Sequence, residues 1–292
     1  FSHKYNRGVL GMLTGSRDYP GAALMSVRAA LNTGVGMVRF NGKDDTLRTL
    51  MLGQNPETVC FTGPPAHEHV HAWAGGSGTG PETLDHNRYL LNAPEPAILD
   101  AGAVDLAADY MMAGHSLGEH KILTPHAGEF ERFLRRIHEH SPQRWEEMLD
   151  GALVPSREDI NAEPFRWVRA ACELSGATVM LKGSTTLIAA PVGATYSVHG
   201  ATGWLATAGS GDTLTGILGA LLAQYMAAAQ ERHEQVEGCT YASLAALAVY
   251  LHNRAALASL EGRKGPVPPS RVAAYLPQAI AGLLDEKAVL DD

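Results

Sequence analysis

Short apolar runs alternate along the chain with longer segments in which apolar residues recur at helical spacing. A short apolar run between glycine or polar residues is typical of a buried strand, whereas a longer amphipathic segment is typical of a helix. The first runs are Val9–Leu13 and Val35–Phe40, and an alanine-rich segment from Gly21 to Asn32 separates them. This pattern predicts a strand, a helix and a second strand.

The same alternation continues through the rest of the chain. Further strands are predicted at Thr58–Phe61, Val70–Ala74, Ala97–Leu99, Lys121–Leu123, Thr178–Leu181 and Thr186–Ala190. Further helices are predicted at Pro81–Leu91, Val104–Met112, Ala127–Arg136, Pro164–Leu174, Asp212–Gln230, Cys239–Leu260 and Arg271–Asp285. Strands and helices that alternate at these lengths predict an α/β fold with a mostly parallel sheet covered on both faces.

The length of 292 residues suits one large α/β domain or two small ones, and no internal repeat is visible. We expect a single domain over residues 1–292. The stretch 138–162 is polar and charged, contains Pro142 and Pro155, and has no clean period. We therefore expect a surface insertion there and not a domain boundary.

Composition and charge exclude several classes of protein. The chain is 45% hydrophobic, which argues against disorder, and its net charge of −8 without a basic tract argues against a protein that binds duplex nucleic acid. The most apolar stretch, Ile217 to Ala223, is far shorter than the roughly 18 residues that span a membrane. The chain begins with Phe1, so we expect that a leading segment has been removed or left out. Three cysteines, far apart, favour a reducing cytoplasm.

The strongest chemical signal is Gly209-Ser210-Gly211-Asp212, which opens a predicted helix. Glycines at a helix start allow backbone N–H groups to approach an anion, and the helix dipole favours negative charge there. A phosphate site is one interpretation. The other is that Asp212 is only a helix cap.

A second signal follows the predicted strand Thr178–Leu181. Lys182, Gly183, Ser184, Thr185 and Thr186 offer a cation and hydroxyls that suit a phosphate or a ribose. A hairpin turn with a solvated lysine is the alternative. The sequence contains no GxxxxGK[ST] motif, so any nucleotide site is not a P-loop. The glycines of residues 75–80 do not match GxGxxG, so they are only weak evidence for a Rossmann fingerprint.

Histidines give one further candidate. His126 lies at a strand-to-helix junction, where open α/β sheets bind ligands, although it could be a simple helix start. Residues 67–71 match HExxH, but Gly63-Pro64-Pro65 just upstream argues against the helix that a zinc site requires. We assign no side chain as a metal ligand, and we expect His252 to be a packing or surface residue.

Several motifs occur in a characteristic order along the chain: His3-Lys4-Tyr5, Tyr19-Pro20-Gly21-Ala22-Ala23, the loop Gly76–Gly80, Ile98-Leu99-Asp100-Ala101, Thr124–Glu129, Lys182–Thr186 and Gly209–Asp212. In this order they resemble the ADP- or ATP-dependent NAD(P)H-hydrate dehydratases of the ribokinase-like superfamily. The resemblance extends from about residue 3 to 285. It implies a ribokinase-like three-layer α/β/α sandwich with a mostly parallel central sheet.

The resemblance also implies an activity, the repair of nicotinamide cofactor. The family uses ADP or ATP to dehydrate the S-form of hydrated NADH or NADPH, which releases phosphate and AMP or ADP. By the same resemblance Ala22, Gly78, His126 and Asp212 contact the hydrated dinucleotide, and Lys182–Thr186 with Gly211 hold the nucleotide. Asp212 would be the base, and Gly209, Ser210 and Gly211 would cradle the transferred phosphoryl group, with Mg²⁺ bridging the phosphates. A homotetramer is expected, and an NAD(P)H-hydrate epimerase as a fused or separate partner.

Two positions depart from the family pattern. Gly102 stands where the family usually has a second acid after Asp100, so that carboxylate contact is absent and Asp100 is left without an assigned role. Trp204 stands where many members have asparagine. The alternative function is a ribokinase-like kinase of a vitamin-precursor alcohol, of the hydroxyethylthiazole or hydroxymethylpyrimidine type, whose product would retain the phosphate. A nucleotide-binding module without turnover is a third interpretation.

Overall fold

A computed structural model describes the chain from residue 3 to residue 290, and in this range nine strands form one sheet. Their spatial order is β3-β2-β1-β4-β5-β6-β7-β8-β9. Strands β3 to β7 of this order pair in parallel, whereas β7-β8 and β8-β9 are antiparallel. The strands are β1 (Val9–Leu13), β2 (Met37–Asn41), β3 (Val59–Phe61), β4 (Ala72–Gly75), β5 (Ala97–Leu99), β6 (Lys121–Leu123), β7 (Thr178–Leu181), β8 (Thr186–Ala189) and β9 (Thr195–Val198).

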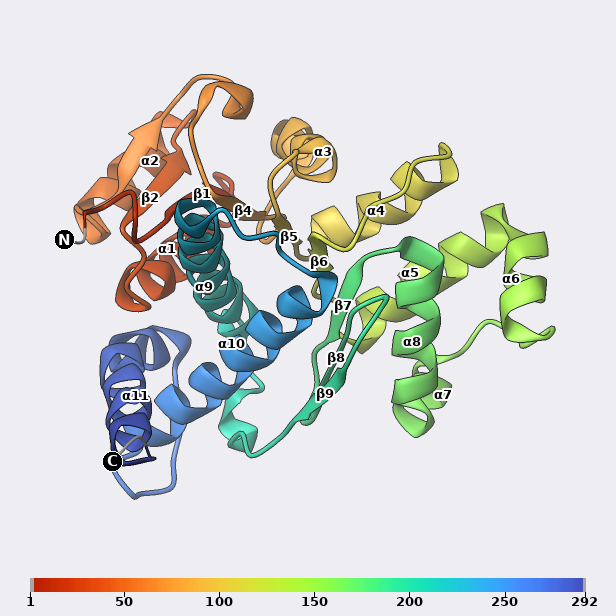
Figure 1. The fold of residues 1–292 in the computed structure, drawn as a ribbon. Coiled ribbons are helices and arrows are strands. Elements are labelled where there is room, and N and C mark those ends of the chain that lie inside the picture. Colours follow the sequence, from red (N-terminus) through yellow and green to blue (C-terminus); the bar gives the residue numbers. More distant parts are fainter. Residues whose placement is uncertain (1–2, 291–292) are drawn as a thin grey trace.

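Helices cover both faces of the sheet, so the predicted α/β sandwich is confirmed (Figure 1). One face carries α1 (Pro20–Asn32), α9 (Ser210–Arg232), α10 (Gly238–Ser259) and α11 (Pro269–Leu290), and α2 (Asp45–Gln54) packs beside α1. The other face carries α3 (Leu84–Asn92), α4 (Gly102–Met112), α5 (Ala127–His140) and α8 (Pro164–Ser175).

Each face of the sheet has its own apolar core, because side chains alternate along a strand. In β1, Leu10 and Met12 belong to the core under α1 and α9, whereas Val9 and Leu13 belong to the opposite core. A strand that is buried on both faces is continuously apolar, which is why the short apolar runs predicted these strands well.

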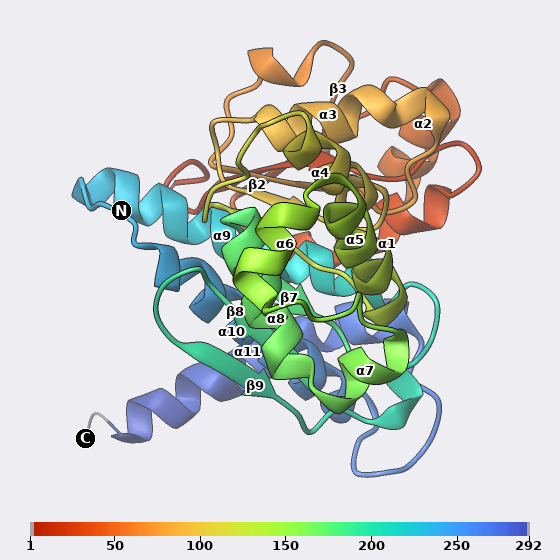
Figure 2. The same ribbon diagram turned by 90° about the vertical axis from the view of Figure 1, so that its right-hand side faces the viewer.

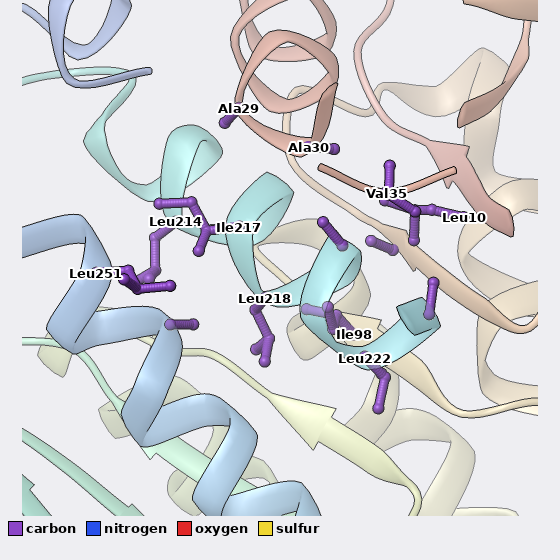
Figure 3. Packing of buried hydrophobic residues seen from close by; sticks show 14 of the residues in the cluster. Leu10, Ala29, Ala30, Val35, Ile98, Leu214, Ile217, Leu218, Leu222 and Leu251 are labelled. Carbon is purple, nitrogen blue, oxygen red and sulfur yellow. The ribbon is translucent and has the colours of Figure 1, made fainter. Parts of the chain in front are cut away.

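Helix α9 lies at the centre of one core, with Leu214, Ile217 and Leu218 directed to the sheet and to its neighbours (Figure 3). It packs most closely on α1: a Cβ added to Gly216 would lie 2.1 Å from the carbonyl oxygen of Ser26. Only a residue without a side chain allows this approach of the two backbones.

The stretch 138–162 contains regular structure that its sequence pattern did not predict. After α5 ends at His140, α6 (Pro142–Leu149) and α7 (Arg157–Ala162) follow and pack on α5 (Figure 2). Trp145 and Ile160 are buried there, and the indole N–H of Trp145 donates to the Ala152 carbonyl at 2.7 Å. Helix α2 and strand β9 were also not predicted.

Three short 3₁₀ helices, η1 (Pro65–His67), η2 (Pro81–Thr83) and η3 (Gly203–Leu205), complete the regular structure. The predicted helix Pro81–Leu91 is therefore η2 followed by α3. Between residues 3 and 290, no helix is long and apolar enough to cross a bilayer.

Candidate functional site

The order in which the chain adds strands to the sheet reverses next to β1. Strands β2 and β3 follow β1 on one side, while β4 and its successors lie on the other side. The chain also leaves β1 for α1 on one face and leaves β4 for α3 on the opposite face. In open α/β sheets the crevice at such a switch point, beyond the carboxyl ends of the strands, binds ligands.

Hydrogen bonds join the two segments that diverge at this switch point. The amide of Gly15 donates to the carbonyl of Ser77 at 2.8 Å, and the hydroxyl of Thr14 donates to the same carbonyl at 2.8 Å. The hydroxyl oxygens of Thr14 and Ser77 are also 2.8 Å apart. Both residues are buried, so this pairing fixes one wall of the crevice.

Asp100 follows β5 and lies at the centre of the site, where sequence reasoning had not placed it. It is 2% exposed. Its Oδ1 accepts hydrogen bonds from Lys182 Nζ at 2.7 Å and from the Thr124 hydroxyl at 2.7 Å, and its Oδ2 accepts from the Thr215 hydroxyl at 3.3 Å. A buried carboxylate requires such partners.

Lys182 follows β7 and turns into the site, so the alternative of a solvated turn lysine is wrong. Burial alone would lower the pKa of Lys182, but the charges of Asp100, Glu129 and Asp212 outweigh burial and raise it. The ammonium group therefore stays charged. Beyond it, Gly183, Ser184 and Thr185 are exposed at the tip of the β7–β8 hairpin, and Thr186 begins β8.

The start of α9 lies beside this lysine. Gly209 is the N-cap residue with a φ of +92°, and a Cβ on it would lie 2.5 Å from the Met25 sulfur. A Cβ on Gly211 would lie 3.4 Å from Lys182 Nζ. The free N–H groups of this helix end and the lysine ammonium thus lie next to each other, an arrangement suited to a phosphate.

Asp212 occupies the first turn of α9, but it is not the cap, because the N-cap position belongs to Gly209 and no side chain caps the helix there. Burial and the charge of Asp100 raise the pKa of Asp212, while a hydrogen bond from Ser77 and the charge of Lys182 lower it. The net shift is upward. A carboxylate with a raised pKa accepts a proton more readily, as a general base must.

His126 is the N-cap residue of α5, as the helix-start interpretation predicted, and its ring is also exposed. Its Nδ1 accepts from the amides of Gly128 at 3.0 Å and Glu129 at 3.3 Å, and the Glu129 carboxylate accepts from the His126 amide at 2.9 Å. This reciprocal pair is a capping box. The side chain is still 57% exposed, with Nε2 3.5 Å from Oε1 of Glu129, so part of the ring is open to a ligand.

Ala22 of α1 and Gly78, the residue after Ser77, lie against each other. Gly78 has a φ of +62°, and a Cβ on it would lie 2.6 Å from the Cβ of Ala22. The structure therefore brings two groups of predicted residues to one edge of the sheet: Ala22 and Gly78 near the switch point, and Lys182 with residues 209–212 farther along.

The two departures from the family pattern have different surroundings. A Cβ on Gly102 would lie 2.9 Å from the Thr79 hydroxyl and 3.2 Å from the Asn87 amide nitrogen, so those two side chains occupy the space of the missing acid. Trp204 lies in η3 and is exposed.

Neither the HExxH segment nor His252 extends the site. Residues 68–71 lie outside η1, so the HExxH segment is not the helix that its zinc chemistry needs. Among the described residues, no group of three or more histidine, cysteine or acidic side chains could hold a metal ion. His252 is buried, and burial lowers its pKa to about 4, as in a neutral packing residue.

Comparisons with known proteins identify the family of the chain. The model of the family described as NAD(P)H-hydrate dehydratase matches residues 10–278. The chain is 33% identical to the bifunctional NAD(P)H-hydrate repair enzyme Nnr of Mycobacterium leprae over 96% of its own length and 52% of that protein. It is also 33% identical to the ADP-dependent (S)-NAD(P)H-hydrate dehydratase of Neisseria meningitidis, over 76% of this chain and 72% of that protein.

Among solved structures, the ADP/ATP-dependent NAD(P)H-hydrate dehydratase of Bacillus subtilis, co-crystallised with ATP and Mg²⁺, superposes with a TM-score of 0.74. The identity is 26%, over 96% of this chain and 91% of that one. The chain spans about half the length of the first bifunctional relatives that it matches.

Proposed function

Because this chain belongs to the NAD(P)H-hydrate dehydratase family, we propose that it is a carbon–oxygen lyase that restores hydrated NADH and NADPH at the expense of ADP or ATP. The observation that carries the proposal is the cluster of Lys182, Gly211 and Asp212 at one sheet edge, which Asp100 joins through its ion pair with Lys182.

Phosphorylation makes the dehydration feasible, because hydroxide is a poor leaving group and phosphate a good one. We propose that Asp212 takes the proton of the ring hydroxyl as its oxygen attacks the terminal phosphoryl group of the nucleotide. The N–H groups of Gly209, Ser210 and Gly211 would stabilise the charge on that group. The ring nitrogen lone pair would then expel phosphate, and loss of a proton from the neighbouring ring carbon to solvent would restore the double bond and the lone pair.

The substrates are assigned to the two flanks of Asp212. Ala22, Gly78 and the exposed ring of His126 would contact the hydrated dinucleotide. Lys182–Thr186 and Gly211 would hold the adenine nucleotide, with the Lys182 ammonium against its phosphates. The raised pKa of Lys182 supports this role, because the group stays charged.

Mg²⁺ fits this site as an ion carried by the nucleotide. It is commonly bound by one or two carboxylates together with phosphates and water, and not by a protein cage. Asp212 is the carboxylate that would face the ion, because both oxygens of Asp100 already accept hydrogen bonds from Lys182, Thr124 and Thr215. When bound, it would neutralise phosphate charge.

Three further features belong to the proposal. We expect a homotetramer in the cytoplasm that works with an NAD(P)H-hydrate epimerase, and the bifunctional relatives support the last point. Sedimentation of the purified chain tests the tetramer.

The decisive experiment supplies hydrated NADH, Mg²⁺ and either ADP or ATP, and follows the absorbance of reduced nicotinamide together with free phosphate. We expect one phosphate per NADH restored. Restoration without nucleotide would contradict the proposal. Phosphate retained on a thiazole or pyrimidine alcohol would favour the kinase alternative instead.

A further inference from the structure

A cavity of about 340 Å³ lies at the carboxyl ends of β1 and β2. Its lining includes Thr14 and Ser16 after β1, Asn41 and Lys43 at and after β2, and His86 of α3. Its volume falls within the usual range of small-ligand pockets, about 300–1,000 Å³. None of the residues assigned above to the nucleotide or the reacting ring lines it.

The cavity shares a wall with the proposed reaction centre. Thr14 lines the cavity and is hydrogen-bonded to Ser77, which is in turn hydrogen-bonded to Asp212. In the sheet, β2 and β1 lie on one side of β4 and β5, whereas β7 with Lys182 lies on the other. The cavity and the nucleotide segment are therefore on opposite flanks of Asp212.

Among the charged side chains that the structure describes, one cation of the cavity has no carboxylate partner. Arg17 lies 3.6 Å from Asp44, whose other oxygen accepts from the Leu47 amide at 2.8 Å. Lys43 makes no ion pair with any carboxylate that the structure describes.

A buried nitrogen lies near that cation. Nδ1 of His86 is buried and has no hydrogen-bond partner in the described chain. Burial and the nearby charge of Lys43 lower the pKa of His86. The lining contains two acids, Asp44 and Glu82. Oε2 of Glu82 lies beside Gly80, 2.6 Å from the position that a Cβ on this glycine would take. Lys43 and His86 thus offer an anion two partners.

We propose that this cavity binds the adenylate half of the hydrated dinucleotide, with Lys43 against the 2′-phosphate that distinguishes NADPH from NADH. The inference rests on the proposed function. Two strand spacings, about 10 Å, separate β4 from β2. An extended dinucleotide spans that distance, so its ring would lie at Asp212 while its far end lies at Lys43.

The test compares kcat/KM for hydrated NADPH and hydrated NADH in Lys43→Gln. We expect the NADPH-to-NADH ratio to fall about tenfold, the scale of a lost hydrogen bond to a charged group. Lys264→Gln, which changes an exposed lysine between α10 and α11, is the matched control and should keep the wild-type ratio. An equal loss for both hydrates would overturn the assignment, because it would place Lys43 on the pyrophosphate common to both.

A binding measurement separates this inference from the proposed function. With ADP saturating, calorimetry measures the affinity of adenosine 2′,5′-bisphosphate and of 5′-AMP without turnover. Wild type should prefer the bisphosphate, and Lys43→Gln should lose that preference. Equal affinities in wild type would overturn the inference, whether or not the chain restores the cofactor.

Discussion

Lys182 Nζ lies 2.7 Å from Oδ1 of Asp100, and the two side chains are 19% and 3% exposed. They follow β7 and β5, two strands of the sheet that are separated by β6. The pair therefore connects the proposed nucleotide segment to the centre of the site. Because both charges are buried, removal of one partner should change the free energy of unfolding measurably.

Lys182→Met should destabilise the fold by about 3 kcal/mol, because it leaves the Asp100 carboxylate buried without its cation. Urea unfolding measures the change. The double variant Asp100→Asn with Lys182→Met should cost less than the sum of the single changes, since the unpaired charge is gone. Additive costs would show that the pair has no coupling.

Asp212→Asn should leave the melting temperature nearly unchanged, because Gly209 holds the cap position and the substitution removes repulsion from Asp100. Turnover should fall by about 10²–10⁴, the usual contribution of a general base. Cofactor restoration and thermal unfolding measure the two effects. A wild-type rate in this variant would assign the base elsewhere.

Ser77→Ala should move the acidic limb of the pH–rate profile to higher pH. The Ser77 hydrogen bond lowers the pKa of Asp212, so its loss raises that pKa further. A base works only when deprotonated, and activity would then be lost at a higher pH as the solution is acidified. Ser175→Ala, which changes a buried serine of α8 outside the site, is the control and should leave the limb in place.

His126→Asn should separate capping from ligand binding, because asparagine is a good N-cap. We expect near-wild-type stability and a loss of about 1–3 kcal/mol in hydrate affinity, with nucleotide affinity retained. His126→Ala should lose about 1 kcal/mol of stability as well. Calorimetry and thermal unfolding measure these effects. Undiminished hydrate binding by the asparagine variant would leave His126 as a cap alone.

Sequence patterns predicted the buried strands better than any other part of the fold. Val9–Leu13, Ala97–Leu99, Lys121–Leu123 and Thr178–Leu181 have the predicted bounds, because strands covered on both faces are short apolar runs. Strand β9 is partly exposed and lies at the sheet edge, so it lacks such a run. In α2 only Leu47 and Met51 are buried, which leaves a weak helical pattern.

The sequence predicted those parts of the site that consist of residues adjacent along the chain. It did not predict the parts that form only when distant segments meet in the fold. Gly209–Asp212 and Lys182 could be recognised locally. Asp100 could not, because its partner Lys182 lies 82 residues away and the pairing exists only once β5 and β7 are in one sheet.

The close contact of α1 and α9 limits how the site can move. Ser26 and Gly216, whose backbones touch, each lie one helical turn beyond a proposed functional residue, Ala22 in α1 and Asp212 in α9. Separating those two residues would require the core between the helices to open. Motions during turnover should therefore be confined to exposed loops such as the β7–β8 tip, and amide hydrogen exchange should find the hydrogen-bonded amides in the second turns of both helices equally slow.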